Sequence, residues 1–229
     1  MNSLAGLEYT VARVPAGPAL DGDFDGPGWR RAAPLDINQF RPESGAHRPR
    51  TQGRLLYMPD ALFVSFRVED RYVRCVTTEY QGPVYRDACV EFFVEPKAGK
   101  GYFNFEMNCG GALLLRHVTN PDRTSGELAG FTNIPWQIAS KIEIYHSMPE
   151  TVDPEIVDPV AWVVQYTIPL ELFEPYIGRV GDPAGQTWRG NFYKCAENNS
   201  HPHYASWSPV GGPLNFHQPD YFAPIVFQA

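Results

Sequence analysis

The sequence predicts one all-β domain, an antiparallel β-sandwich of the jelly-roll or immunoglobulin-like kind with short helical turns. Three observations predict it. Short segments of alternating apolar and polar residues recur along the 229 residues, and 22 prolines and 20 glycines supply turns between them. No long segment has the apolar period of a helix. Neither a repeat nor a low-complexity linker divides the chain, so residues 1–229 are expected to form a single domain.

The individual elements follow from this alternation and from the turn residues that bound it. Two short helical turns are expected at 27–32, where Trp29 enters the core, and at 169–173, with Pro169 at its first position. Residues 41–50 and 117–136 are predicted to be irregular. A hairpin joins 52–58 to 62–68, and 138–145 is expected to pair with 162–168. The predicted strands are 9–14, 52–58, 62–68, 73–78, 87–94, 102–109, 112–116, 138–145, 162–168, 188–195 and 221–227.

The segment YFNFEMNC at 102–109 alternates without a break. Side chains of a strand point to opposite faces with period two, so its two sets of residues share opposite faces. The apolar set is Phe103, Phe105 and Met107, which should face the core; the polar set is Tyr102, Asn104, Glu106 and Asn108. A sheet face with amides, a carboxylate and an aromatic ring is suited to bind a hydroxylated ligand or a cation.

The preceding strand, 87–94, is joined to 102–109 by the turn-like segment 96–101. If Val90 and Phe92 face the core, Glu91 joins the polar face, and one allowed register places it opposite Glu106. Two close carboxylates share a proton, hold a cation, or act as acid and base. Neighbouring strands form a flat face rather than a cleft, which favours hydroxyl binding or calcium over catalysis.

Composition excludes several classes of function. The net charge of −7 without a basic stripe argues against nucleic acid, and we expect no nucleotide cofactor. No apolar run is long enough to span a membrane. Residues 1–7 lack the features of a signal peptide, so the protein is either cytosolic or a mature secreted form whose signal was removed. The four cysteines are widely spaced without a CxxC pair, which predicts buried free thiols rather than a zinc ribbon.

Three further groups of residues occur in a fairly specific order. They are LDGDFD (20–25) followed by Trp29; FVSFRVED (63–70) followed by DACVEFF (87–93); and WVVQYTIP (162–169) with GNFYKC (190–195), HPHYASW (201–207) and FHQPDYF (216–222). In this order they resemble the family 9 carbohydrate-binding modules, in particular a free-standing bacterial branch of that family.

The resemblance implies a β-sandwich that binds the ends of sugar chains and carries structural calcium. It further implies a sugar held between two tryptophans, with a Glu, an Arg and an Asn bonding its hydroxyls. Trp207 matches one tryptophan, Glu91 the carboxylate and Asn108 the amide. Tyr85 stands in the loop that carries the second tryptophan, and Glu106 occupies the arginine position.

From these matches we expect non-catalytic binding of mono- or oligosaccharide ends. The predicted site has Trp207 and Tyr85 as stacking groups, with Glu91, Asn108, Glu106 and Lys194 as polar contacts. By itself Trp207 reads as a core residue, and the resemblance turns the interpretation toward stacking. Lys194 lies within an apolar strand and is either an edge residue or a ligand contact. Asp70 and Asp87 are the predicted calcium ligands.

Two alternatives stay open. A small glycoside-processing hydrolase would use Glu91 and Glu106 as its carboxylates. A b-type haem protein would use Met107 and His117 as ligands, although Met107 is predicted to face the core.

His201, His203 and His217 form the one histidine cluster of the sequence. A His-x-His pair can hold a transition metal. Pro202 lies between the first two, which predicts a loop or sheet edge and favours polar contacts around the binding face.

Overall fold

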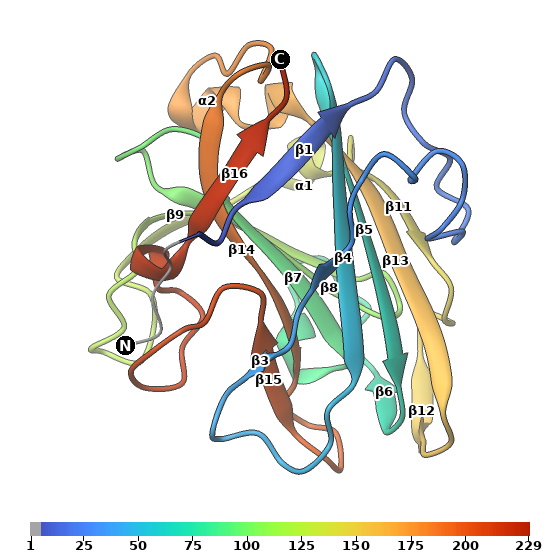
Figure 1. Cartoon of the computed structure of the whole chain (residues 1–229). Helices are drawn as coiled ribbons and strands as arrows, with labels where there is room; N and C mark the ends of the chain where they lie inside the picture. The colour runs from blue at the N-terminus through green and yellow to red at the C-terminus, as the bar shows by residue number, and fades with distance from the viewer. Residues whose placement is uncertain (1–5) are drawn as a thin grey trace.

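The computed structural model describes residues 6–229. Most of the segment 1–7, for which no signal peptide is expected, lies outside this range. The chain forms a β-sandwich built from one large curled sheet (Figure 1). The first layer contains β10 (Gly130–Asn133), β9 (Leu113–Asn120), β8 (Tyr102–Asn108), β7 (Cys89–Glu95), β14 (Thr187–Ala196) and β16 (Ala223–Phe227). The second contains β4 (Arg50–Met58), β5 (Ala61–Asp70), β13 (Val160–Pro169) and β11 (Glu143–His146).

The strand β1 (Tyr9–Arg13) joins the two layers, because it pairs with β16 on one side and β4 on the other. Both of these pairings are parallel, whereas the strands within each layer are antiparallel as predicted. Shorter strands extend the sheet at its margins. They are β2 (Leu35–Asp36) on β4, β15 (His203–Ser206) on β14, and β3 (Gln39–Phe40) on β15, while β6 (Val73–Cys75) pairs separately with β12 (Val152–Ile156).

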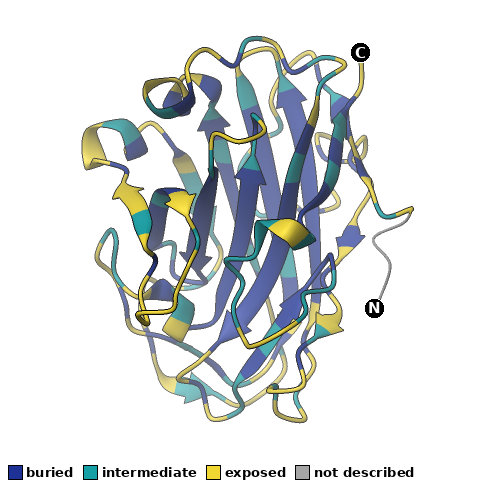
Figure 2. Ribbon diagram, turned by 90° about the vertical axis from the view of Figure 1, so that its left-hand side faces the viewer, coloured by how far each residue is buried: buried dark blue, intermediate teal, exposed yellow. Residues whose placement is uncertain are grey.

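The main core lies between the layers, where aromatic rings from both sides meet. Phe105 of β8 stacks on Tyr166 of β13 with ring centroids 6.3 Å apart, and Phe66 of β5 lies 5.9 Å from Phe192 of β14. The strands are buried along most of their length, while the connecting loops are exposed (Figure 2). The core also holds Phe103 and the other apolar residues of β8, so the predicted alternation of β8 is confirmed.

Helical structure is limited to single turns. These are η1 (Val84–Arg86), α1 (Trp136–Ala139), η2 (Leu170–Leu172), α2 (Glu174–Ile177) and η3 (Pro219–Tyr221). The turn expected at 169–173 is present, whereas 27–32 forms hydrogen-bonded turns and no helix. None of the described helices is long and apolar enough to cross a membrane. Trp29 is buried as predicted, but it packs in a separate cluster with Leu56 and Phe63 on the outer side of the second layer. All four cysteines are free and buried, which confirms the prediction.

Several predicted boundaries were wrong. The segment predicted as one strand at 138–145 begins with the helical turn α1, and only β11 is extended; β11 does pair with β13 as expected. The segment predicted as irregular at 117–136 contains the end of β9 and all of β10. Because β10 is largely exposed, its sequence lacks the apolar alternation that identifies a half-buried strand.

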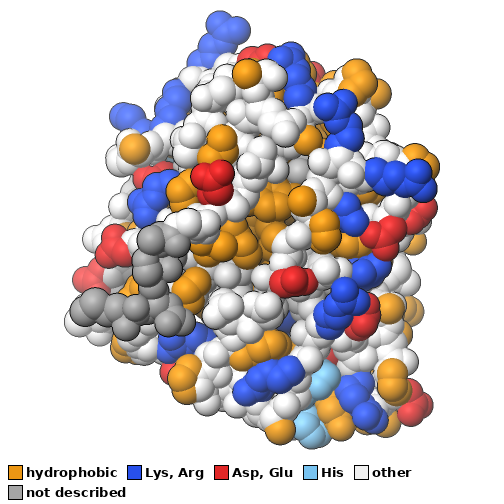
Figure 3. Space-filling view, viewed as in Figure 1, with side chains coloured by type: hydrophobic (Ala, Val, Ile, Leu, Met, Phe, Trp, Pro, Cys, Tyr) orange, Lys and Arg blue, Asp and Glu red, His pale blue; other side chains and the backbone are white. Residues whose placement is uncertain are grey.

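On the face that carries the paired strands β1 and β16, hydrophobic side chains gather near the centre and charged side chains lie around them (Figure 3). Scattered apolar atoms are normal on a protein surface. The polar face of β7 and β8 is different, because all seven residues of β8 are buried. Polar side chains there are covered by loops rather than by the second layer, and this covering forms the candidate site.

Candidate functional site

Glu91 of β7 and Glu106 of β8 lie directly opposite each other in the antiparallel register. This is the allowed register that, in the sequence analysis, places the two carboxylates opposite each other. Both side chains lie on the face turned away from the main core, and their residues are only 3% and 4% exposed. The β7–β8 hairpin therefore places two buried acids side by side.

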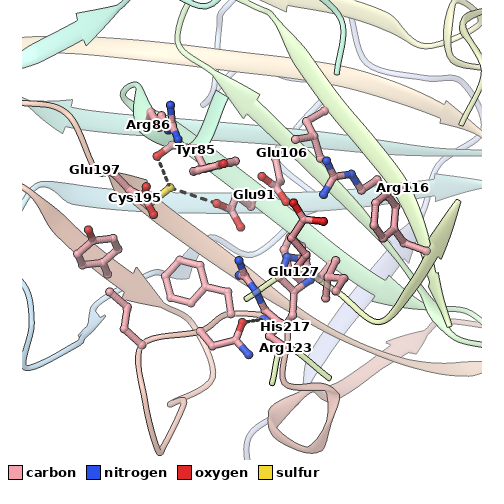
Figure 4. Close-up of a pocket in the computed structure, with 18 residues that line it drawn as sticks. Tyr85, Arg86, Glu91, Glu106, Arg116, Arg123, Glu127, Cys195, Glu197 and His217 are labelled. Atoms are coloured by element: carbon pink, nitrogen blue, oxygen red, sulfur yellow. Dashed lines mark hydrogen bonds between the residues drawn. The ribbon is translucent and has the colours of Figure 1, made fainter. Parts of the chain in front are cut away.

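A cavity of about 420 Å³ lies over this pair (Figure 4). Its floor is the outer face of β7, β8, β9 and β14, and its walls come from the loops before β7, before β10 and after β15. The lining residues are aromatic, cationic and acidic. They include Tyr85, Arg86, Glu91, Phe93, Glu106, Arg116, Arg123, Glu127, Phe131, Cys195, Glu197, Tyr204, Phe216 and His217.

The two acids at the floor have raised pKa values. Burial raises the pKa of Glu106 to about 7, although the hydrogen bond from Asn104 and the charges of Arg116 and Arg123 act in the opposite direction. Burial, together with Cys195 and Glu106, raises the pKa of Glu91 well above its ordinary value. No salt bridge formed by the described residues reaches either carboxylate. The pair therefore retains a proton near neutral pH.

Asn104 orients Glu106. Its amide nitrogen donates to Glu106 Oε1 at 2.6 Å, and its amide oxygen accepts from the backbone N–H of Arg116 at 3.0 Å. Asn104 is fully buried, so its amide is held by these two bonds. Glu106 is thus aimed at the cavity by a side chain two positions before it on the same face of β8.

The cationic groups of the cavity are three arginines that come from separate elements. Arg116 of β9 donates to Asn133 Oδ1 at 3.1 Å, and its guanidinium lies 4.5 Å from the ring centroid of Phe131. Arg123 donates to the carbonyl of Gly126 at 3.3 Å. A guanidinium has five N–H donors, so most donors of these groups remain for a ligand.

Aromatic rings supply much of the remaining wall. Phe216 stacks on Tyr193 with centroids 4.3 Å apart, while Phe131 is 39% exposed at the cavity wall. His217 shares a hydrogen bond of 2.8 Å between its Nδ1 and the Tyr102 hydroxyl. Rings of this kind offer apolar faces beside directional polar groups.

Of the six residues predicted to contact a ligand, the cavity brings together Tyr85, Glu91 and Glu106. Trp207 lies elsewhere. It is 7% exposed in the main core, edge-on to Tyr9 at 6.4 Å and to Phe192 at 6.0 Å, and it does not line the cavity. In this structure Trp207 therefore occupies a core position rather than a place in the cavity wall.

Asn108 shares the polar face but serves a turn. Its amide donates to the carbonyl of Thr77 at 2.8 Å and to Asp87 Oδ2 at 2.9 Å, and its oxygen accepts from the N–H of Ala112 at 2.9 Å. The Asp87 carboxylate also accepts from the N–H of Thr77. The amide of Asn108 and the carboxylate of Asp87 are thereby engaged within the protein.

Lys194 points to the opposite face of β14 from Tyr193 and Cys195. It is fully buried, lies 3.6 Å from Asp70 Oδ2 and makes a 2.8 Å hydrogen bond with His203 Nε2. Asp70 also accepts from His47 Nε2 at 2.6 Å. Burial alone would raise the pKa of Asp70, but Lys194 and the bond from His47 outweigh it and lower that pKa to about 2.

Neither predicted calcium ligand, Asp70 or Asp87, falls within a group of three potential metal ligands among residues 6–229. Asp70 already faces a lysine and a histidine, and Asp87 accepts from neutral N–H donors. The donors around Asp70 make it a poor cation site, because a positive charge occupies the place that calcium would take.

The histidine cluster is divided between two places. His203 contacts Lys194 and His47, whereas His217 contacts Tyr102 and Phe93 at the cavity. The two residues of the haem alternative are also engaged within the protein. Met107 is buried in the main core, and His117 makes a 2.8 Å hydrogen bond with the carbonyl of Lys100. Neither Met107 nor His117 lines the cavity.

The arginines and most of the aromatic residues of the cavity were missed by sequence reasoning. Arg123 and Phe131 belong to a segment that was predicted to be irregular, and Phe216 to a loop near the C-terminus. The available signal was local: Arg116, Arg123 and Phe131 lie within one stretch, 114–131, that has no apolar period. Only the fold shows that this segment covers the polar face of β8.

The β-sandwich has a recessed cavity lined by carboxylates, arginines and aromatic rings, a lining that is compatible with sugar binding. The comparison with known families agrees. The model of carbohydrate-binding family 9 matches residues 30–227, and the chain belongs to this family. No curated protein matches the sequence.

Solved structures share the fold. One is a Bacteroides uniformis protein provisionally described as carbohydrate-binding, with a TM-score of 0.83 and 26% identity over 96% of this chain and 99% of that one. Others are a family 9 carbohydrate-binding module from Caldicellulosiruptor kristjanssonii with cellotriose (TM-score 0.65, 12% identity, 97% and 94% covered) and with glucose (0.62, 13%, 97% and 96%).

Proposed function

We propose that this protein binds carbohydrate without catalysis in the cavity above β7 and β8. The observation that carries the proposal is the buried pair of Glu91 and Glu106, which forms no salt bridge with any described residue and lies beneath aromatic walls. A cavity of about 420 Å³ falls within the usual range for small-molecule sites.

The chemistry of the floor suits hydroxyl groups. With pKa values raised to about 7 for Glu106 and well above the ordinary value for Glu91, the pair offers a carboxyl O–H that donates and carboxyl oxygens that accept. A sugar hydroxyl does both as well. Arg116 and Arg123 add donors, and Tyr85 and Phe216 add faces for the apolar C–H surface of a ring.

We further propose that the ligand is a monosaccharide or the end of an oligosaccharide. The acids lie at the floor of a recess that loops surround, so a chain would enter by its end rather than cross the sheet. Glucose and cellotriose are the first candidates, because related modules of this family are solved with them.

The hydrolase alternative has less support. Glu91 and Glu106 lie side by side on one floor, whereas glycosidase carboxylates flank the bond that they cleave. The family is one of carbohydrate binding. A Glu91→Gln variant separates the two, because it would abolish turnover in an enzyme and only weaken binding in a module, by about 1–2 kcal/mol.

Isothermal titration calorimetry with a panel of monosaccharides and oligosaccharides, including glucose and cellotriose, tests the proposed site. Phe131→Ala removes a partly exposed cavity ring and should weaken the best ligand by about 1 kcal/mol. Trp136→Ala is the matched control, because Trp136 is 58% exposed and packs on Tyr80 outside the cavity. Equal losses in both variants, or no heat with any sugar, would contradict the assignment.

A further inference from the structure

Three potential metal ligands meet at the floor of the cavity. The ligand atoms of Cys89, Glu91 and Cys195 all lie within 4.8 Å of one another. In the part of the chain that the structure describes, no other three His, Cys, Asp or Glu side chains gather this closely. All three residues are buried, and the Cys195 sulfur lies 3.1 Å from Glu91 Oε1.

The sheet register creates this group. Cys89 and Cys195 are directly paired across β7 and β14, and Glu91 lies two residues along β7 from Cys89. Period two places these side chains on the same face. The triad therefore belongs to rigid, paired strands rather than to a mobile loop.

We propose that Cys89, Glu91 and Cys195 bind a thiophilic divalent cation of the zinc class at the floor of the cavity. Two thiolates and a carboxylate are donors that Zn²⁺ takes, with Zn–S of about 2.3 Å and Zn–O of about 2.0–2.2 Å. Ligand atoms at those distances around one ion lie about 3.5–4 Å apart, so the observed spacing needs only small side-chain movements. Each thiol, and the Glu91 carboxyl where it is protonated, releases its proton to solvent as it binds.

The charges around the group are the second observation that supports a cation. Glu91 is buried opposite a second carboxylate and accepts from the Cys195 thiol, without a salt bridge from any described residue. A buried acid of this kind is stabilised by a proton or by a metal. Calcium is disfavoured, because it takes oxygen ligands and two of these three are sulfur.

The position also leaves room for a fourth ligand. Glu91 and Cys195 line the cavity, whereas Cys89 is fully buried beneath them. A cation held by the three would be open toward the cavity on one side. Open coordination of this kind accepts a water molecule or a ligand hydroxyl.

Titration of the metal-free, fully reduced protein with Co²⁺ tests the site, because cobalt bound by thiolates has visible bands and a near-ultraviolet charge-transfer band. One equivalent should produce both. Cys195→Ser and Cys89→Ser should each remove the charge-transfer intensity that comes from the replaced thiolate. Each should also weaken Zn²⁺ binding by at least about tenfold. Glu91→Gln should weaken it as well, whereas Glu106→Gln, which alters the facing acid, should leave the bands in place.

Cys109→Ser is the matched control, because Cys109 is also a buried strand-end thiol but lies outside the group. It should retain the full cobalt spectrum. Circular dichroism confirms that each variant folds. If a variant fails to fold, zinc-edge X-ray absorption of the zinc-loaded wild-type protein is measured instead. Its spectrum should be fitted by two sulfur ligands at about 2.3 Å from the metal. Absence of a charge-transfer band in the wild type, or equal loss in Cys109→Ser, overturns the site.

The outcome is independent of sugar binding. Calorimetry of the metal-free and zinc-loaded forms with the same sugars separates the two. A normal cobalt spectrum without sugar binding refutes only the proposed function, and sugar binding without a cobalt spectrum refutes only the metal site.

Discussion

Two buried charged clusters lie on opposite faces of β14, and they differ in how their charges are balanced. The core cluster consists of the buried residues Asp70, Lys194 and His203 with the half-buried His47, and the cavity cluster of Cys89, Glu91, Glu106 and Cys195. In the core cluster an acid faces a lysine at 3.6 Å and a histidine at 2.6 Å. In the cavity cluster two acids face each other.

The pKa values of the two clusters move in opposite directions for this reason. Lys194 and His47 outweigh burial at Asp70 and lower its pKa to about 2, while burial raises that of Glu106 to about 7. The first cluster is complete within the protein and acts as a structural link between β5 and β14. In the second no salt bridge among the described residues reaches either acid, which is expected where a ligand supplies the remaining contacts.

The largest expected effect comes from breaking the core cluster. Lys194→Met leaves Asp70 buried without its lysine and should lower the free energy of unfolding by about 3–5 kcal/mol. Urea denaturation measures this. The double variant with Asp70→Asn should recover part of the loss, because it removes the stranded charge. A loss below about 1 kcal/mol in the single variant would mean that the pair is not a balanced ion pair.

The core and cavity faces also predict different roles for two aromatic residues. Trp207→Ala deletes a ring from the main core and should lower the free energy of unfolding by about 3 kcal/mol. Tyr85→Ala deletes a ring from the cavity and should mainly reduce sugar affinity. Thermal melts and calorimetry on both variants give the comparison. A stable Trp207→Ala protein that has lost sugar binding would show that Trp207 contacts the sugar and is not a core residue.

A smaller effect is expected at Glu106, and its size depends on pH. The pKa of Glu106 is about 7 in the folded protein, above its ordinary value of 4.5. The protonated carboxyl therefore makes its full contribution to the free energy of unfolding below about pH 4.5, and this contribution is lost as the pH rises through 7. In metal-free protein, Glu106→Gln should therefore be more stable than wild type by on the order of 2 kcal/mol above neutral pH and similar to it in acid. Urea midpoints across this range test the difference.

The smallest effect is expected for the exposed ion pair between Arg50 and Glu69, whose charged atoms are 2.8 Å apart. This pair is the reference for the stability changes of the other variants. Both side chains are exposed, so Arg50→Ala should change the free energy of unfolding by about 0.5 kcal/mol or less. A change as large as that of Lys194→Met would show that burial does not explain the difference between the clusters.

The sequence predicts the sandwich and the cavity floor well, because both follow from local alternation. Period two alone places Glu106 on the polar face, and the short hairpin turn allows the register that sets it against Glu91. The resemblance added Tyr85, which does line the cavity.

What the sequence does not predict depends on contacts between distant segments. Lys194 is buried because Asp70, on a strand of the other layer, meets it across the core. Arg123 and Phe131 reach the cavity only because their loop folds back over β8. Trp207 directly follows a short strand, β15, and no local pattern distinguishes its core position from an exposed one.

The most direct test is a crystal structure of the protein with the tightest sugar from the calorimetric panel. We predict sugar density in the cavity, with ring hydroxyls within hydrogen-bond distance, about 2.6–3.2 Å, of Glu91 and Glu106. An empty cavity with an ordered sugar elsewhere on the molecule, for example beside Trp207, would contradict the assignment of the cavity as the carbohydrate site.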